Sequence, residues 1–305
     1  MSVPPEVVVC GEAMLLMVSE PGVPLERARA FRASVAGAET NVAAGLSRLG
    51  HRTRWLGRVG ADPAGRSVLA RLRADGIDTS HAVVDRDAPT GLLLRDSHPA
   101  RGIDVQYYRA GSAASRLSPG ELTAEMVAGA RLVHFTGITA MLSESAHLAA
   151  LRLVELAREA GATVSFDPNV RLKLGTPTRW RERIAPLMAM ADVVLAGEDE
   201  LELVGEPGPG PLLVVKHRDK SATCQGIRQE PFPVTVADPV GAGDGFAVGF
   251  LSGMLRGLPY EDCLREAAAV AALVVQCADD TDGLPHREEL ERALAAFAGA
   301  EMVHR

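Results

Sequence analysis

Short apolar runs alternate with amphipathic segments along most of the chain. In the second half, the apolar runs predict strands at 132–135, 163–166, 193–195 and 212–216. The segments between them have helical spacing and predict helices at 143–160, 180–190 and 198–204. The first half predicts a strand at 7–10, a helix at about 39–49, a strand at 53–59 and a helix that opens at Asp62-Pro63. Because right-handed crossovers join such strands, the pattern predicts an α/β fold, a three-layer αβα sandwich with a mainly parallel sheet.

Residues 77–109 interrupt this alternation of strands and helices. They contain short pieces of alternating apolar and polar residues at 82–84, 91–95 and 103–108, separated by turn residues and without a helical period. This stretch therefore predicts a small separate β-sheet.

The ends of the expected strands mark where a ligand would bind, since ligands of open α/β sheets lie beyond the carboxyl ends of the strands. The residues that follow expected strands are Gly11-Glu12, Gly137, Asp167-Pro168-Asn169, 197–200 and Asp238 onward.

The composition excludes several classes of partner. The chain has 305 residues and a formal charge of −7, and it has no long basic block, which argues against nucleic acid and against an anionic membrane surface. No run reaches the roughly 18 apolar residues of a membrane span, and the first residues lack the charge and apolar pattern of a signal peptide. We therefore expect a cytoplasmic protein with a small-molecule partner.

The sequence DPVGAGDGF, residues 238–246, is the clearest candidate for chemistry. Three glycines before an apolar helical pattern predict free backbone N–H groups at a helix N-terminus, which is an anion-binding arrangement. Asp244 adds a negative charge there, and it either complements the helix dipole or takes part in a reaction. A helix N-terminus lowers a carboxyl pKa, so Asp244 is expected to stay ionised. The P-loop signature G-x-x-x-x-G-K-[ST] is absent, and the dinucleotide-binding signature G-x-G-x-x-G does not follow the first strand. The sequence therefore gives no support to either of these nucleotide sites.

Two segments resemble a known family. DPVGAGDGFAVGF is similar to the D-T-x-G-A-G-D-x-F signature of the ribokinase-like (PfkB) carbohydrate kinases, and AGAETNVAAGLSRLG (36–50) is similar to their G-G-x-x-x-N-x-A-x-x-L-x-x-L-G segment. The resemblance covers essentially the whole chain and implies one ribokinase-like domain, 1–305, with lid strands within about 12–38 and 82–110. It implies that Gly241, Ala242 and Gly243 form the anion hole and that Asp244 is the catalytic base. Gly37 would let a ligand approach the backbone, and Asn41 would offer its amide to sugar hydroxyls.

Two further segments resemble the 2-keto-3-deoxygluconate kinases within that family. VQYYRAGSAAS (105–115) and DPNVR (167–171) imply that Tyr107, Arg109, Asp167 and Arg171 bind a sugar acid. A guanidinium group can hold a carboxylate through two hydrogen bonds, which suits a sugar acid. The alternative is that Arg109 and Arg171 are solvated surface arginines. The implied reaction is phosphorylation of the primary hydroxyl by ATP. A kinase for a neutral sugar or a nucleoside, and a sugar-sensing protein without catalysis, remain the alternatives.

The nucleotide side departs from the family pattern. Gly197 replaces the asparagine of the magnesium motif, although Glu200 is retained for Mg²⁺. Arg218 and Ser221 replace the two glycines of V-K-x-G-x-x-G, and Ala268 replaces an asparagine near the adenine. The resemblance implies nucleotide binding by Lys216, Arg218, Gly241, Gly243 and Ala268. It also implies K⁺ binding at Asp238 and a homo-oligomer, a dimer joined through the lid.

Overall fold

The computed structural model describes residues 4–96 and 102–303, with side chains up to residue 299. Its described residues form an eight-stranded sheet in the order β14-β13-β12-β11-β10-β9-β1-β4. The strands are β1 (Val7–Cys10), β4 (Thr53–Leu56), β9 (Leu132–Thr136), β10 (Thr163–Asp167), β11 (Val193–Gly197), β12 (Leu212–Lys216), β13 (Ala222–Cys224) and β14 (Ile227–Gln229). Neighbouring strands from β12 to β4 are parallel, and β13 and β14 are antiparallel additions at one edge. The predicted mainly parallel sheet is confirmed.

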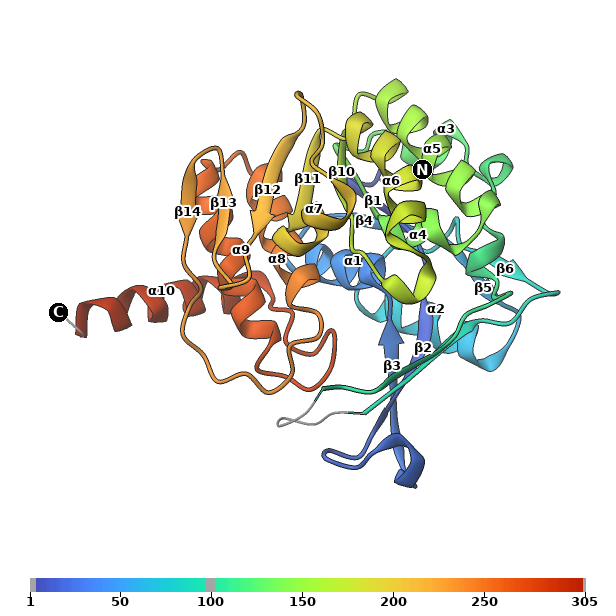
Figure 1. The fold of residues 1–305 in the computed structure, drawn as a ribbon, viewed down its shortest axis with the longest axis horizontal. Helices are drawn as coiled ribbons and strands as arrows, with labels where there is room; N and C mark the ends of the chain where they lie inside the picture. Colours follow the sequence, from blue (N-terminus) through green and yellow to red (C-terminus); the bar gives the residue numbers. More distant parts are fainter. Residues whose placement is uncertain (1–3, 97–101, 304–305) are drawn as a thin grey trace.

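Helices cover both faces of this sheet (Figure 1). One face packs against α1 (Ala38–Arg48), α2 (Pro63–Ala74), α8 (Ala242–Leu255), α9 (Tyr260–Val274) and α10 (Arg287–Val303). The other packs against α3 (Ala124–Val127), α4 (Gly137–Leu142), α5 (Glu144–Glu159), α6 (Pro177–Met190) and α7 (Glu198–Val204). In β1, Val7 and Val9 enter one core and Val8 and Cys10 the other, because successive side chains of a strand point to opposite faces. The three-layer sandwich is thereby confirmed.

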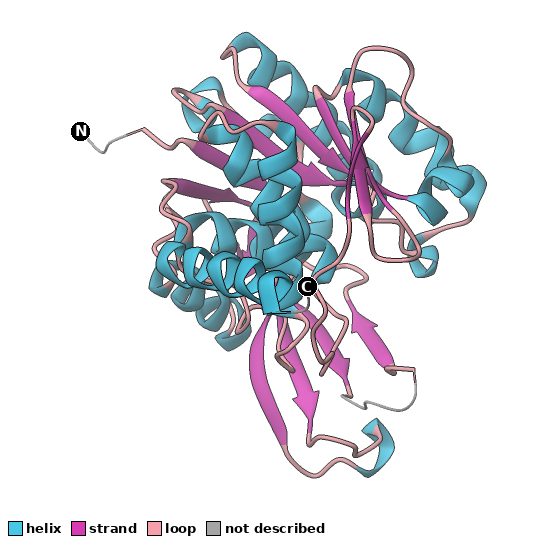
Figure 2. Cartoon of the chain, turned by 90° about the vertical axis from the view of Figure 1, so that its left-hand side faces the viewer, coloured by secondary structure: helices cyan, strands magenta, loops and turns pink. Residues whose placement is uncertain are grey.

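A second sheet of four strands projects from the sandwich (Figure 2). Its order is β3-β2-β7-β8, from β3 (Phe31–Ala36), β2 (Met14–Ser19), β7 (Gly91–Arg95) and β8 (Val105–Tyr108). We call it the lid sheet. It is mixed, since β2 pairs with β7 in parallel and the other pairs are antiparallel. Residues 97–101, inside the range expected for lid strands, lie outside the described residues.

Two details of the expected strands are wrong. The run at 53–59 is broken at Gly57, so that β4 stays in the main sheet and β5 (Arg58–Gly60) leaves it. The piece expected at 82–84 becomes β6 (Val83–Asp85), which pairs with β5 and not with the lid sheet. A Cβ on Gly57 would lie 2.6 Å from the carbonyl oxygen of Gly11, and this close approach of two segments of the chain accompanies the break.

No helix of the described residues is long and apolar enough to cross a lipid bilayer.

Candidate functional site

A cavity of about 400 Å³ lies between the carboxyl ends of the central strands, the N-termini of α1 and α8, and the lid sheet. It brings together residues far apart in the sequence. The predicted site residues that line it are Gly37, Asn41, Tyr107, Arg109, Asp167, Arg171, Glu200, Lys216, Gly241, Ala242, Gly243 and Asp244. The strand-end rule thus located the cavity, although Asp238 follows an irregular segment and not a strand. The N–H groups of Ala237 and Asp238 anchor that segment to the carbonyl oxygen of Val275.

The N-terminus of α8 presents free N–H groups to this cavity. Gly241 is the N-cap, with a φ of 81° that glycine adopts readily, and it turns the chain sharply into the helix. In the described part of the chain, the N–H groups of Gly241, Gly243 and Asp244 have no acceptor. The first N–H groups of any helix lack partners within it, so this turn can bind an anion.

Asp244 lies on the first turn of α8, within reach of two side-chain amides. Asn41 Nδ2 donates to its Oδ2 at 2.8 Å, and Asn169 Nδ2 lies 3.4 Å from its Oδ1. Burial raises the pKa of Asp244 to about 7, although the Asn41 hydrogen bond and the charge of Arg171 lower it. The expectation of a lowered pKa is therefore wrong, because the loss of solvation outweighs the favourable position at the helix N-terminus.

The N-terminus of α1 forms the facing wall. Gly37 has a φ of 151°, and a Cβ there would lie 2.3 Å from the carbonyl oxygen of Glu12, so a larger residue does not fit. The first turn of α1 carries Glu39, which is fully buried and accepts hydrogen bonds from Thr136 and Thr139. Burial raises the pKa of Glu39 above its ordinary value. These contacts fix α1, and with it Asn41, against the end of β9.

Positive charge gathers where β8 meets the cavity. The guanidinium of Arg109 stacks over the Tyr107 ring at 4.2 Å and pairs with Glu12 at 3.1 Å. Burial raises the pKa of Glu12 to about 7, against the lowering effect of Arg109. Arg171 has no carboxylate partner among the described residues, and its one hydrogen bond goes to the carbonyl oxygen of Val170. Arg171 is therefore available to an anionic ligand.

A second cavity of about 440 Å³ shares Tyr107, Arg109 and Arg171 with the first. Lys173 and Arg179 also line it, and no Asp or Glu is among the described residues of its wall. Arg179 lies in the first turn of α6, which contains no acidic residue to balance the helix dipole. The second cavity, which adjoins the first at Tyr107, Arg109 and Arg171, therefore favours negative charge.

Three charged groups meet on the other side of the Asp244 turn. Lys216 Nζ donates to Asp167 Oδ2 at 2.7 Å, and a Cβ on Gly243 would lie 3.8 Å from the same Nζ. Burial lowers the pKa of Lys216, but Asp167 and Glu200 raise it more, so that it lies above its ordinary value. Burial raises the pKa of Glu200, and the charge of Asp167 raises it further. The two carboxylates are thus close enough to favour a cation between or beside them.

A third cavity, of about 330 Å³, shares Lys216, Ala242 and Gly243 with the first. Arg218 and Ser221 line it, so the two residues that replace family glycines lie at its wall. Arg218 is exposed and pairs with Glu202, and Ser221 donates to Asp219 at 2.6 Å. Ala268 is half-buried in α9 and does not line this cavity, whereas Ala271 does.

Asp238 does not line the cavity. Its carboxylate is buried and pairs with Arg95 of the lid sheet at 2.6 Å, so the structure places a guanidinium where K⁺ was expected.

The strand ends marked Glu12 and Asn169 as residues near a ligand, and both line the cavity, but the sequence assigned neither a role. Sequence reasoning missed Arg95, which has no such signal. Several buried polar atoms of the wall lack a hydrogen-bond partner in the described part of the chain: Glu12 Oε1, Asn41 Oδ1, Asn169 Oδ1 and Arg109 Nε. Because unpaired buried polar atoms are costly, this wall is suited to a ligand with several hydroxyl groups.

Known proteins resemble this chain in sequence and in fold. The family model described as pfkB family carbohydrate kinase matches residues 5–287. A 2-dehydro-3-deoxygluconokinase from Bacillus subtilis (strain 168) is 36% identical over 315 residues, which cover 95% of this chain and 96% of that protein.

Two solved structures extend the likeness to three dimensions. A PfkB protein from Polaromonas sp. JS666 is 40% identical, with a TM-score of 0.83, and the match covers 94% of this chain and 99% of that one. A 2-dehydro-3-deoxygluconokinase from Thermotoga maritima is 26% identical, with a TM-score of 0.89 and coverage of 95% and 99%.

Proposed function

Since the chain belongs to the pfkB family of carbohydrate kinases, we propose that it transfers the γ-phosphoryl group of ATP to the primary hydroxyl of a sugar acid. The proposed substrate is 2-keto-3-deoxygluconate, also called 2-dehydro-3-deoxygluconate, and the proposed product is its 6-phosphate. The observation that carries this choice is Arg171, which lines the cavity and has no carboxylate partner among the described residues. A neutral sugar would leave the exposed Arg171 guanidinium to water, whereas a sugar acid would pair with it.

The acid end of the substrate would contact Tyr107, Arg109 and Arg171. Two planar guanidinium groups can orient one carboxylate, and the Tyr107 ring holds the Arg109 guanidinium by stacking. The unpaired oxygens of Asn41, Asn169 and Glu12 would accept hydrogen bonds from sugar hydroxyls. Such contacts fix the sugar chain between the lid sheet and α8.

Asp244 would orient the primary hydroxyl of the sugar and take its proton. As the hydroxyl oxygen bonds to the γ-phosphorus, the bond from that phosphorus to the β–γ bridging oxygen breaks and ADP leaves. The hydroxyl proton passes to the Asp244 carboxylate. A base with a pKa of about 7 suits this transfer at neutral pH.

The N–H groups of Gly241, Gly243 and Asp244 would hold the transferred phosphoryl group, with Lys216 beside them. Magnesium would supply charge neutralisation of the phosphates. The residues present fit it, because Asp167 and Glu200 line the same cavity and the charge of Asp167 raises the pKa of Glu200, an effect that a nearby cation would oppose. No group of three His, Cys, Asp or Glu side chains in the described residues could hold a metal alone. Magnesium commonly binds through one or two carboxylates and the substrate's phosphates.

The adenosine part of ATP would occupy the third cavity, next to Lys216 and Gly243. Arg218 lies on its wall and would either turn to the phosphates or stay with Glu202. The lid sheet would close over the sugar and exclude water, which prevents wasteful hydrolysis of ATP.

We further propose a cytoplasmic homodimer joined through the lid sheet. Both faces of this sheet are apolar. Met14, Leu16 and Leu93 pack in its inner cluster, whereas Leu15 and Leu92 point to the opposite face and are only half-buried. The outer face also carries Tyr108, which is 56% exposed. A second copy of this sheet would cover these apolar side chains.

Release of ADP, measured with MgATP and a panel of sugars, tests the proposed function. We expect turnover with 2-keto-3-deoxygluconate and the shift of one ³¹P signal to that of a phosphomonoester at the primary position. Weak turnover with fructose, ribose and nucleosides is expected. A preference for a neutral sugar would contradict the substrate, and the absence of turnover with every sugar would favour a binding protein.

A further inference from the structure

We infer that the Arg95 guanidinium, and not a monovalent cation, is the fixed positive charge beneath the catalytic loop, Asp238–Asp244. We also infer that Arg95 is a positioning residue that ties the lid sheet to this loop. The structure thus disagrees with the K⁺ site that the family resemblance implies.

Arg95 is the last residue of β7, and its side chain is buried, with 1% exposed. Its Nη1 donates to Asp238 Oδ2 at 2.6 Å, and its Nη2 donates to Asp280 Oδ1 at 2.9 Å. The Asp238 and Asp280 side chains are 1% and 6% exposed. Burial lowers the pKa of Arg95, but the two carboxylates raise it more, so the group stays charged.

The oxygens of Asp238 are both engaged. Oδ2 accepts from Arg95, and Oδ1 accepts from the N–H of Val240 at 2.9 Å. Val240 precedes Gly241, the N-cap of α8, so the position of Asp238 sets the turn that aims the free N–H groups. A K⁺ ion at Asp238 would have to displace the guanidinium or sit beside a like charge, and these residues therefore do not fit it.

Asp280 extends the link to a second segment. We call Ala278–Leu284 the acidic loop, because it contains Asp279, Asp280 and Asp282. A Cβ on Gly241 would lie 3.0 Å from the carbonyl oxygen of Asp280, so the acidic loop packs directly against the catalytic loop. Arg95 therefore bonds to both loops from the lid sheet.

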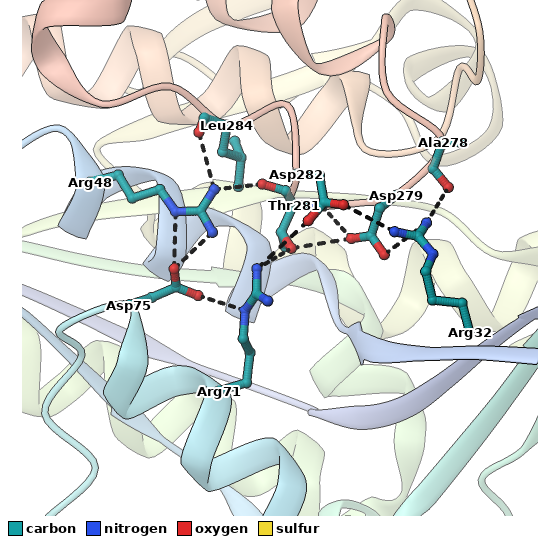
Figure 3. A network of polar contacts seen from close by, with 9 residues as sticks. All are labelled: Arg32, Arg48, Arg71, Asp75, Ala278, Asp279, Thr281, Asp282 and Leu284. Carbon is teal, nitrogen blue, oxygen red and sulfur yellow. Dashed lines mark hydrogen bonds and ion pairs between the residues drawn. The ribbon is translucent and has the colours of Figure 1, made fainter.

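Three other arginines hold the outer side of the acidic loop (Figure 3). Arg32 of β3 donates to Asp282 at 3.0 Å and to the carbonyl oxygen of Ala278 at 3.1 Å. Arg48 donates to the carbonyl oxygens of Thr281 and Leu284, and Arg71 pairs with Asp282 at 3.8 Å. The Arg32 side chain is 50% exposed. Among these arginines, Arg95 is the one that reaches the catalytic loop, so Arg32 supplies a matched control from the same sheet.

The first test compares KCl, NaCl and choline chloride at equal ionic strength. The wild-type rate should agree within about twofold among the salts, and the thermal midpoint of the ligand-free chain should not rise specifically with K⁺. A K⁺-specific activation of about tenfold or more, or a K⁺-specific rise in that midpoint, would overturn the inference.

The second test compares Arg95→Met and Arg95→Lys with Arg32→Met. Arg95→Met should lower kcat by about 10²-fold, the order seen when one donor of an anion hole is misplaced, with a smaller change in the KM for MgATP. The kcat of Arg95→Lys should lie between those of wild type and Arg95→Met. Arg32→Met should change kcat by less than about threefold.

Rescue separates positioning from a loss of folding. In Arg95→Ala, added guanidinium chloride or KCl should restore part of kcat, and choline chloride should not. An unchanged kcat in Arg95→Met, or equal losses in Arg95→Met and Arg32→Met, would contradict the positioning role. If the Arg95 variants do not fold, the wild-type salt series still decides whether the positive charge at Asp238 comes from Arg95 or from a bound K⁺.

Discussion

The carboxyl group of Asp244 lies between two asparagine amides and near the negative charges of Asp167 and Asp280. Burial raises its pKa to about 7, and this value makes the group both an acceptor and a proton carrier near neutral pH. The asparagines hold the carboxylate in place, while the N–H groups of Gly241, Gly243 and Asp244 have no acceptor in the described residues and could bind a phosphoryl group. A single turn of α8 can therefore serve both reactants.

The pH profile of kcat/KM should show this group directly. Because the pKa of Asp244 is raised to about 7, the ionised fraction falls as the pH drops through 7, and kcat/KM should fall about tenfold from its plateau by pH 6. Initial rates between pH 5 and 9 with saturating MgATP measure it. A profile that stays flat down to pH 5 would contradict the assignment.

Asp244→Asn is the matched control for that profile. It should lower kcat by about 10²- to 10⁴-fold, the range for loss of general base catalysis, and should remove the limb at pH 7. The Asp244→Asn variant should still fold. The raised pKa means that ionisation of Asp244 costs stability as the pH rises from about 4 to 7, so the variant should be no less stable than wild type at pH 8.

At the scale of elements, the lid sheet has the least usual pattern. The runs Met14–Ser19 and Gly91–Arg95 are apolar almost throughout, as in strands that are covered on both faces. In the described structure one face covers the substrate cavity and the other face is partly open. This is the pattern expected of a sheet with a partner.

Leu92→Asp tests the lid face. Leu92 pairs with Leu15 and Tyr108 on the outer face, so a charge there should prevent association while the inner cluster stays packed. Light scattering after size exclusion should give twice 32.2 kDa for wild type and 32.2 kDa for the variant. Leu148→Asp, a change at an exposed leucine of α5, should remain a dimer. A monomeric wild type would refute the proposed assembly.

Most elements followed from the sequence because each has a strong local pattern. Examples are the strands of the central sheet and helix α2, whose N-cap Asp62 accepts a hydrogen bond from the N–H of Gly65. The pairing of β6 with β5 could not be predicted, since a three-residue strand has no pattern that selects its partner. The break at Gly57 likewise depends on the approach of Gly11, which is a tertiary contact.

At the scale of the whole molecule, the net charge and the charge around the second cavity have opposite signs. The chain carries −7, yet the described wall of the second cavity holds Arg109, Arg171, Lys173 and Arg179 and no carboxylate. The sign of the local field decides which small anions bind, whereas net charge acts on solubility and on large partners. Composition favoured a small-molecule partner, but it carried no information on whether the proposed substrate is acidic.

The site was predictable where its residues lie in short motifs and not where it depends on pairing across the chain. The glycine turn and Asp244 were visible as one motif. The contact of Asn41 with Asp244 and that of Arg95 with Asp238 join residues 203 and 143 positions apart. A single sequence contains no signal for such pairs, and the raised pKa of Asp244 depends on its burial in the folded chain.

The ratio of kcat/KM for 2-keto-3-deoxygluconate to that for fructose, in wild type and in Arg171→Gln, tests the central claim most directly. Wild type should favour the acid. Arg171→Gln should lower kcat/KM for the acid by about 10- to 100-fold, the order of one lost charged hydrogen bond, and leave that for fructose nearly unchanged. Arg179→Gln, at an exposed residue that lines the second cavity but not the first, should change the ratio by less than about threefold. A wild-type preference for fructose, or a ratio that Arg171→Gln does not alter, would contradict a sugar-acid kinase.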